Sequence, residues 1–266
     1  MIRKLGINTD CIDGISEFSV LDMAHSQGFE AITTSLINIK DVYNLKNRAE
    51  KLGVEFGYLH APFRAINTMW ENGESYLNIY NDICEAITTA SECGVNAVVT
   101  HVSSGWTPPK INDLGLIRFD SLVEFAEKKG VVLAFENLRV PEYLIKIKDR
   151  FVKCDNVRFC FDCGHENCYT KDVSWVDIFK EKLIATHIHD NVGVDPHDKT
   201  ADNDSHWLPL DGNCDYNGII RRLDKYNYSG PLMLEVFNTA RKDYFQMTAE
   251  SFIKTCYDRI NRISKL

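Results

Sequence analysis

The chain has 266 residues, of which 44% are hydrophobic and 26% are charged, a composition typical of a globular protein with a substantial core. Its net charge of −8 provides no overall basic field to attract nucleic acid or an anionic membrane. No segment approaches the apolar length of a membrane span, and the N-terminus lacks the apolar region of a signal peptide, so we expect a cytoplasmic protein.

Short apolar segments alternate with longer segments of helical periodicity along the chain. Eight of the short segments are predicted to be strands, at 4–9, 29–34, 54–60, 96–102, 131–137, 157–162, 183–189 and 231–237. Segments 75–94 and 113–130 carry apolar residues at helical spacing, and each ends in glycine, a usual C-terminal stop. A helical tail is expected from about residue 244 to residue 263.

Continuous apolar strands that alternate with helices predict a parallel sheet covered by helices. Eight such units fit an α/β fold of the (β/α)8 type, a TIM barrel, here with a C-terminal helical tail. The alternative is an open doubly wound sheet, but no glycine-rich phosphate fingerprint follows the first strand. No linker or repeat divides the chain, so we expect one domain over residues 1–266.

The chain contains nine cysteines, four of them close together in sequence: Cys154, Cys160, Cys163 and Cys168. Their spacing is not the paired C-x2-C of a zinc ribbon. Free cysteine is among the most buried residue types, so we interpret these four as buried or incidental thiols rather than a structural zinc site. Without a secretion signal, the cysteines are expected to stay reduced.

Six consecutive predicted strands end in histidine, aspartate or glutamate, residue types that can bind metals. These ends lie at the face where a barrel builds its active site. They are His60, His101, Glu136, Asp162 with His165 shortly after it, His189 and Glu235. Asp204 and His206 follow in the loop after the seventh strand. Glu136 and Glu235 have apolar neighbours in sequence, and a buried charge must be paired or metal-bound. Together these residues predict a metal site.

Imidazole and carboxylate ligands suit Zn²⁺, Mn²⁺, Co²⁺ or Fe²⁺ rather than an all-oxygen calcium cage. His187 precedes His189 by two residues, so both side chains leave a strand on the same side. We expect His187 one layer deeper, beside the site or in the core rather than among the ligands. His197 is interpreted as part of a solvated loop, and His25 as part of an outer helix.

In combination, the segments AFEN, FDCGH, HIHDN, D-S-H and LEVF resemble the xylose isomerase-like TIM barrels, a superfamily that includes sugar isomerases, epimerases and endonuclease IV. The resemblance runs through nearly the whole chain and is clearest from the third strand to the eighth. Its ketose epimerases imply one divalent metal ion, held here by Glu136, Asp162, His189 and Glu235, and a substrate contact from His165.

Endonuclease IV shares this core and builds a trinuclear zinc site. The resemblance to it implies additional metal ligands at His60, His101, His165, Asp204 and His206. However, the loop SLINIKD after the second strand is short, and it lacks the arginine- and aromatic-rich pattern with which that family binds DNA. His101 is followed by Val-Ser, where endonuclease IV would have Pro-Gly. We therefore expect a sugar enzyme, with an abasic-site endonuclease as the alternative and nucleic acid not the expected partner.

Departures from the epimerase pattern also occur. The position six residues after the seventh-strand histidine, where those enzymes place a substrate-binding arginine, is Asp195. The substrate contacts must therefore differ from those of a ketohexose epimerase in the narrow sense.

The resemblance implies a metal-dependent isomerase or epimerase that acts on a sugar, a sugar phosphate or an inosose. Such an enzyme moves a proton next to a carbonyl, and a metal ion such as Zn²⁺ or Mn²⁺ stabilises the enediolate that forms. We assign the catalytic acid/base role to Glu136 and Glu235, which can act from two sides, and orientation of a substrate hydroxyl to His165. A barrel that only binds a sugar is a third hypothesis, although it would not need two such glutamates.

Aromatic and basic residues near these positions are candidates for contacts with a small-molecule sugar. They are Phe63, Trp70, Trp106, Trp207, Arg64 and Arg139. Either arginine could bind a phosphate or carboxylate of the substrate, or pair with an acid of this acidic protein. Relatives commonly form homo-oligomers, but no segment of the sequence identifies an interface.

Overall fold

The structure is a computed structural model that describes residues 2–195, 197–198 and 202–266. Within these residues it has eight strands: β1 Leu5–Asn8, β2 Ala31–Thr34, β3 Glu55–His60, β4 Ala97–Thr100, β5 Val132–Glu136, β6 Val157–Asp162, β7 Leu183–His187 and β8 Leu232–Leu234. All eight predicted strands are confirmed. They pair in parallel in the order β7-β6-β5-β4-β3-β2-β1-β8.

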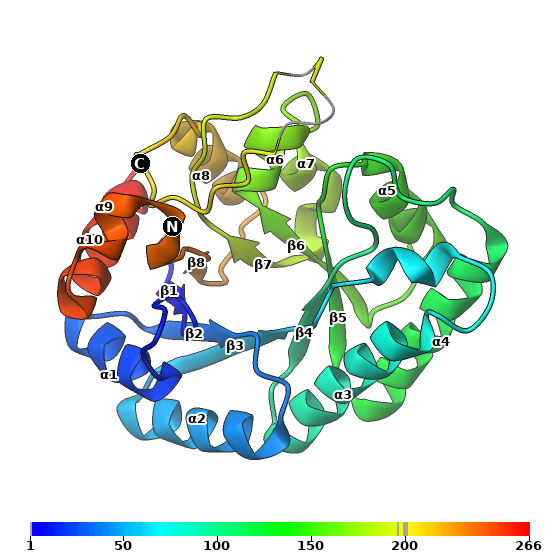
Figure 1. Ribbon diagram of the computed structural model, residues 1–266, viewed down its shortest axis with the longest axis horizontal. Coiled ribbons are helices and arrows are strands. Elements are labelled where there is room, and N and C mark those ends of the chain that lie inside the picture. Colours follow the sequence, from blue (N-terminus) through cyan, green and yellow to red (C-terminus); the bar gives the residue numbers. More distant parts are fainter. Residues whose placement is uncertain (1, 196, 199–201) are drawn as a thin grey trace.

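The two ends of this sheet meet just after β7. Ile188 and Leu234 form a parallel bridge, in which the Ile188 amide donates to the Met233 carbonyl at 2.8 Å and the Glu235 amide donates to the Ile188 carbonyl at 3.2 Å. These bonds complete a ring of strands with helices around it, as Figure 1 shows. The predicted (β/α)8 barrel is confirmed.

The described residues form ten α-helices: α1 Glu17–Gln27, α2 Ile39–Leu52, α3 Leu77–Cys93, α4 Asp113–Lys129, α5 Pro141–Arg150, α6 Cys163–Tyr169, α7 Trp175–Phe179, α8 Tyr216–Lys225, α9 Lys242–Phe245 and α10 Ala249–Ile263. The first four each end at a glycine with positive φ, which lets the chain turn back toward the next strand. The predicted helical tail is two helices, because Thr248 caps α10 as a separate element.

The barrel has two apolar regions, one between the strands and the helices and one inside the ring. The Tyr58 hydroxyl crosses the inside and donates to the Thr186 carbonyl at 3.0 Å. The buried residues of the inner region are Ala31, Tyr58, Ala97, Val99, Ala134, Cys160, Ala185 and Met233. Because they fill the barrel below its C-terminal rim, the polar residues at the strand ends rest on a packed floor.

All nine cysteines, which lie in the described part of the chain, are free thiols. Cys160 packs inside the barrel, and Cys163 and Cys168 are also buried, whereas Cys154 is half-buried. Among the described residues, no cysteine joins a group with metal-binding geometry. Across the same residues, none of the helices has both the length and the apolarity required to cross a membrane.

Candidate metal centre

Glu136 is the last residue of β5, and its carboxylate lies among four imidazole rings at the C-terminal rim of the barrel. One oxygen, Oε2, lies 3.3 Å from Nε2 of His60 and 3.3 Å from Nε2 of His101. The other, Oε1, lies 3.0 Å from Nδ1 of His165 and 3.2 Å from Nδ1 of His187. One carboxylate is therefore the meeting point of residues from five successive parts of the barrel: β3, the segment after β4, β5, the segment after β6, and β7.

The surroundings of Glu136 favour its charged form. Burial alone would raise the pKa of this carboxyl group, because only 1% of Glu136 is exposed. Positive charge on His187 and His101, together with hydrogen bonds from His101 and His165, holds the pKa well below its usual range. The carboxylate is thus ionised and available as a ligand or base.

Asp162 and His187 face each other across the β6–β7 pair, because they are register partners at the ends of these strands. Nδ1 of His187 lies 3.2 Å from Oε2 of Glu235, which directly follows β8, and 3.6 Å from Oδ2 of Asp162. With Glu136, these residues offer four ligand atoms that all lie within 4.8 Å of one another. This nitrogen is buried and has no hydrogen-bond partner in the described structure.

That arrangement fits a divalent metal ion. Buried polar atoms almost always have a hydrogen-bond partner. Here Nδ1 of His187 has none, and the negative charges of the three carboxylates that it faces are not balanced by this one nitrogen. A mixed imidazole and carboxylate set is a donor set for Zn²⁺ or Mn²⁺. The group of four that we refer to as the core group, Glu136, Asp162, His187 and Glu235, could therefore hold such an ion.

His189, which the sequence resemblance placed among the ligands, lies on the other side of Asp162. Its Nε2 is 3.0 Å from each carboxylate oxygen of Asp162, and its ring stacks on that of His206 with centroids 4.0 Å apart. His189 belongs to a second potential ligand group with His206 and Glu235. His187, expected beside the site, is the histidine of the core group.

Gly164, the second residue of α6, makes room for His189. A Cβ atom at this position would lie 1.9 Å from the imidazole ring, so any other residue would displace the ring or the helix. The glycine of the FDCGH segment is therefore required for the close approach of α6 to His189.

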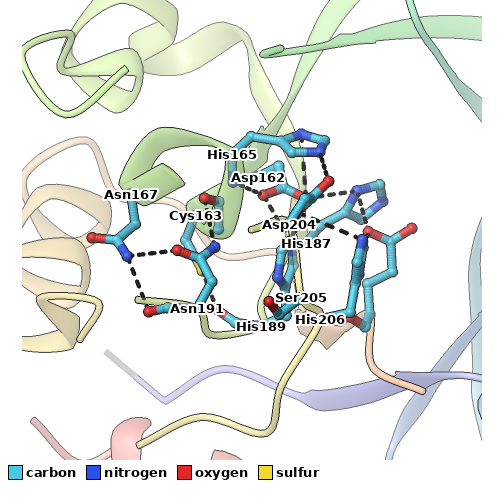
Figure 2. Close-up of polar contacts among 12 residues, drawn as sticks. Asp162, Cys163, His165, Asn167, His187, His189, Asn191, Asp204, Ser205 and His206 are labelled. Atoms are coloured by element: carbon cyan, nitrogen blue, oxygen red, sulfur yellow. Dashed lines mark hydrogen bonds and ion pairs between the residues drawn. The ribbon is translucent and has the colours of Figure 1, made fainter. Parts of the chain in front are cut away.

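The loop after β7 returns to the site through an antiparallel bridge between Asp190 and Trp207. It brings Oδ2 of Asp204 to 2.9 Å from Nε2 of His165, and Oδ1 of the same residue to 3.7 Å from Nε2 of His206 (Figure 2). Burial would lower the pKa of His206, but Asp204 raises it to about 10. Burial would raise the pKa of Asp204, but His165 and His206 hold it well below its usual range.

Three of these histidines are oriented by main-chain carbonyl groups. Nδ1 of His60 donates to the carbonyl of Ala61, and Nδ1 of His206 donates to that of Glu235, each at 2.9 Å. Nε2 of His60 then lies 3.3 Å from Oε2 of Glu136, and Nε2 of His206 lies 3.7 Å from Oδ1 of Asp204. A ring held through one nitrogen while the other faces the site is an arrangement typical of metal-binding histidines. His165 is held in the same way by the Asn137 carbonyl at 2.9 Å.

Asn137 is a positioning residue that the sequence reasoning missed. Its side-chain amide donates to the Asp162 carbonyl, and its side-chain oxygen accepts from the Asp162 amide, both at 2.8 Å. These bonds join the ends of β5 and β6. The only sequence signal for this role is that Asn137 directly follows Glu136.

A cavity of about 260 Å³ opens above these groups. Of the predicted substrate contacts, Phe63 and Arg139 line it, and the Phe63 ring stacks on His101 with centroids 4.3 Å apart.

Trp106 lines a neighbouring cavity instead. Arg64 is exposed outside the lining, and the Arg241 guanidinium lies 5.2 Å from the centre of the Trp207 ring. Trp70, also considered a candidate, is buried in the outer apolar region.

The chain matches the family model described as xylose isomerase-like TIM barrel over residues 21–256. It belongs to this family. The chain is 28% identical to the uncharacterized protein MJ1311 of Methanocaldococcus jannaschii, over 74% of this chain and 69% of that protein. It is 27% identical to the inosose isomerase of Halalkalibacterium halodurans, over 52% of this chain and 49% of that protein.

Solved structures share the fold at lower sequence identity. The IolI protein with a bound zinc atom superposes with a TM-score of 0.76 at 19% identity, over 98% of each chain. Other structures with this fold are sugar 3-epimerases, including enzymes described for D-psicose and L-ribulose. The neighbours of this chain therefore include sugar epimerases and an inosose isomerase.

Proposed function

We propose that this protein is a metal-dependent isomerase or epimerase of a small keto sugar or inosose. The observation that carries the proposal is the position of Nδ1 of His187, buried without a hydrogen-bond partner and 3.2 Å from a carboxylate oxygen of both Glu136 and Glu235. Similarity to an inosose isomerase and to a zinc-bound barrel supports it.

In this proposal the core group holds one divalent ion. When bound, the ion would polarise the carbonyl and hydroxyl oxygens of a keto sugar and so acidify the neighbouring C–H bond. Asp162 is wholly buried and has His189 on its far side, so its part is to hold the ion. His187 supplies the nitrogen ligand.

Glu136 and Glu235 carry the proton in this proposal. Each has a carboxylate oxygen 3.2 Å from the same His187 nitrogen. In this proposal one of them removes a proton from a sugar carbon and the other returns it to the opposite face. The Glu235 side chain is 18% exposed and the Glu136 side chain 1%, so Glu235 is the more accessible of the two to a ligand in the cavity that both line. His165, fixed by Asn137 and Asp204, would orient a substrate hydroxyl.

The direct test is proton exchange at carbon. Protein loaded with Zn²⁺ or Mn²⁺ is incubated in D2O with D-fructose, D-tagatose and an inosose, and deuterium incorporation is followed by NMR. We expect metal-dependent incorporation into at least one of them, lost after chelation and reduced at least about 100-fold in Glu235→Gln. Incorporation into none of these compounds, in protein shown to hold the metal, would contradict the proposal.

An abasic-site endonuclease is the second candidate, and one specific observation favours it. His60 and His101 form a ligand group with Glu136, and Asp204 lies between His165 and His206, so polar clusters flank the core group on both sides. That layout could hold further zinc ions. Nicking of an abasic DNA duplex by protein loaded with Zn²⁺, without deuterium exchange into a sugar, would favour this candidate.

A further inference from the structure

A second cavity, of about 430 Å³, lies next to the candidate metal centre. Arg139 lines both cavities and is the wall that they share. The cavity at the metal centre, at about 260 Å³, is below the roughly 300–1,000 Å³ usual for ligand sites. A ligand that fills a site of the usual size would therefore extend past Arg139 into the second cavity.

The second cavity has an aromatic corner built beside the metal centre. Tyr169 follows His165 by one turn of α6, and their ring centroids are 5.9 Å apart. Trp106, from the segment after β4, meets Tyr169 edge-on, with centroids 5.3 Å apart and an interplanar angle of 89°. Both rings line the cavity. Two perpendicular rings offer an apolar wall and an apolar floor, which suit the C–H faces of a sugar ring.

Arg139 is held in place but keeps donors available. Its side chain is 15% exposed, and its guanidinium lies 4.2 Å from the centre of the Tyr169 ring. Nη2 donates to the Tyr169 hydroxyl at 2.5 Å and to Oδ2 of Asp202 at 2.7 Å. Among the described residues, these bonds use Nη2 alone. Nε and Nη1 are therefore the donors that remain for a ligand next to this wall.

Charge at this cavity is balanced, which excludes a strongly anionic ligand as the best fit. Arg139 is paired with Asp202. Lys171 and Asp172 both line the cavity, one of each sign. A phosphate or carboxylate would gain little electrostatic binding energy from side chains whose charges cancel. The hydroxyl groups of an uncharged sugar can instead bond to both the donors and the acceptors among these side chains.

We propose that the second cavity is a subsite for a glycosyl group, so that a glycosylated keto sugar is bound in preference to the free monosaccharide, which still reacts at the metal centre. The reacting ring would occupy the cavity at the metal centre, and the attached ring would pack in the corner of Trp106 and Tyr169. Arg139 would contact both rings at the link between them. This inference rests on the proposed function, since it names the substrate class of the same site.

Binding to the metal-loaded protein tests this inference without relying on turnover. The probes are D-fructose, its 3-O-, 4-O- and 6-O-glucosyl derivatives turanose, maltulose and isomaltulose, and fructose 6-phosphate, titrated by calorimetry. We expect at least one of the three disaccharides to bind about tenfold more tightly than D-fructose, the gain expected from one aromatic contact. Trp106→Ala should bring this ratio close to one. Tyr43→Ala, which removes an exposed aromatic ring on α2, is the matched control and should leave the ratio as in the unaltered protein.

The possible failures are distinguishable. If D-fructose binds and none of the disaccharides binds more tightly, the glycosyl subsite is refuted while the proposed function stands. If fructose 6-phosphate shows the largest gain, the ligand is anionic and the inference is also refuted. If no keto sugar binds to the metal-loaded protein, both the subsite and the proposed function are refuted.

Discussion

Nδ1 of His187 lies 3.2 Å from Oε1 of Glu136, although these residues belong to β7 and β5, with β6 between them. The two side chains meet over Asp162, at the end of the intervening strand. Buried carboxylates held this close would repel one another unless positive charge lay between them. The metal ion proposed for the core group would supply that charge, and the first three predictions below follow from that proposal.

The first prediction concerns which histidine binds the ion. His187→Ala should remove the bound ion, because it deletes the only nitrogen of the core group. His189→Ala should retain the ion with affinity lowered about 10- to 100-fold, because His189 orients Asp162 from behind. Elemental mass spectrometry of both variants, with circular dichroism to check folding, makes the comparison. Loss of the ion from His189→Ala alone would instead make His189 the ligand, as the family resemblance implied.

A second prediction concerns the carboxylate at the centre of the site. Glu136→Gln keeps the shape of the side chain but removes the charge that four imidazole rings face. We expect loss of bound metal and a fall in deuterium exchange of at least about 100-fold. Glu142→Gln, the same change at an exposed position on α5, is the control. Full exchange activity in Glu136→Gln would show that this carboxylate is not part of the machinery.

The number of ions per chain provides a third prediction. If the core group acts alone, chelator-free protein should contain about one ion, and the double variant His60→Ala/His101→Ala should keep it. Elemental analysis against protein concentration gives both numbers. About three zinc ions in the unaltered protein, with fewer in the double variant, would instead support the endonuclease candidate.

Replacement of Gly164 should destabilise the protein. In Gly164→Ala the new methyl group would overlap the His189 ring, and overpacking of this kind costs about 1–3 kcal/mol of unfolding free energy. Gly53→Ala introduces no overlap, because the added group meets open space, and should cost about 1–2 kcal/mol through its positive φ of 71° alone. Urea denaturation measures both. The two variants also differ in metal binding, because only Gly164→Ala displaces His189.

A fifth prediction concerns Arg118, a buried side chain of α4 that holds the segment after β3. Its guanidinium lies 3.6 Å from the centre of the Tyr76 ring and donates to the carbonyl groups of Thr68, Met69, Glu71 and Gly73. Arg118→Met leaves these acceptors without a donor and should lower the free energy of unfolding by about 3 kcal/mol. Arg48→Met, which breaks the exposed pair with Asp22, should change it by less than about 1 kcal/mol.

The barrel could be predicted from the sequence because each strand is a short apolar run and several helices end at glycine. The end of β7 could not be placed in this way. The apolar pattern continues through Ile188, so LIATHIH reads as one strand, but β7 ends at His187. Ile188 leaves the pairing with β6 and bridges to Leu234 instead. His187, the last residue paired with β6, is therefore level with Asp162, and His189 lies beyond the change of partner.

Contacts between loops also could not be predicted from the sequence. The motif positions identified Glu136, His165 and Asp204 as neighbours, since parallel strands deliver their ends to one rim. Tyr169 and Asp202 gave no comparable signal, because their pairing with Arg139 depends on how the loop after β7 folds back. The side-chain pairing between Asn137 and the main chain of Asp162 likewise depends on the spacing of two strand ends.

The two hydrogen bonds between Asp190 and Trp207 close the loop after β7 at its base, the Asp190 amide donating to the Trp207 carbonyl at 2.8 Å and the Trp207 amide donating to the Asp190 carbonyl at 2.9 Å. His206 is one residue from this clasp and Asp204 is three. Their positions are therefore set by the clasp and not by the length of chain that precedes them. The outer part of this loop can therefore differ in length and sequence between related proteins while His206 and Asp204 keep their places at the metal centre.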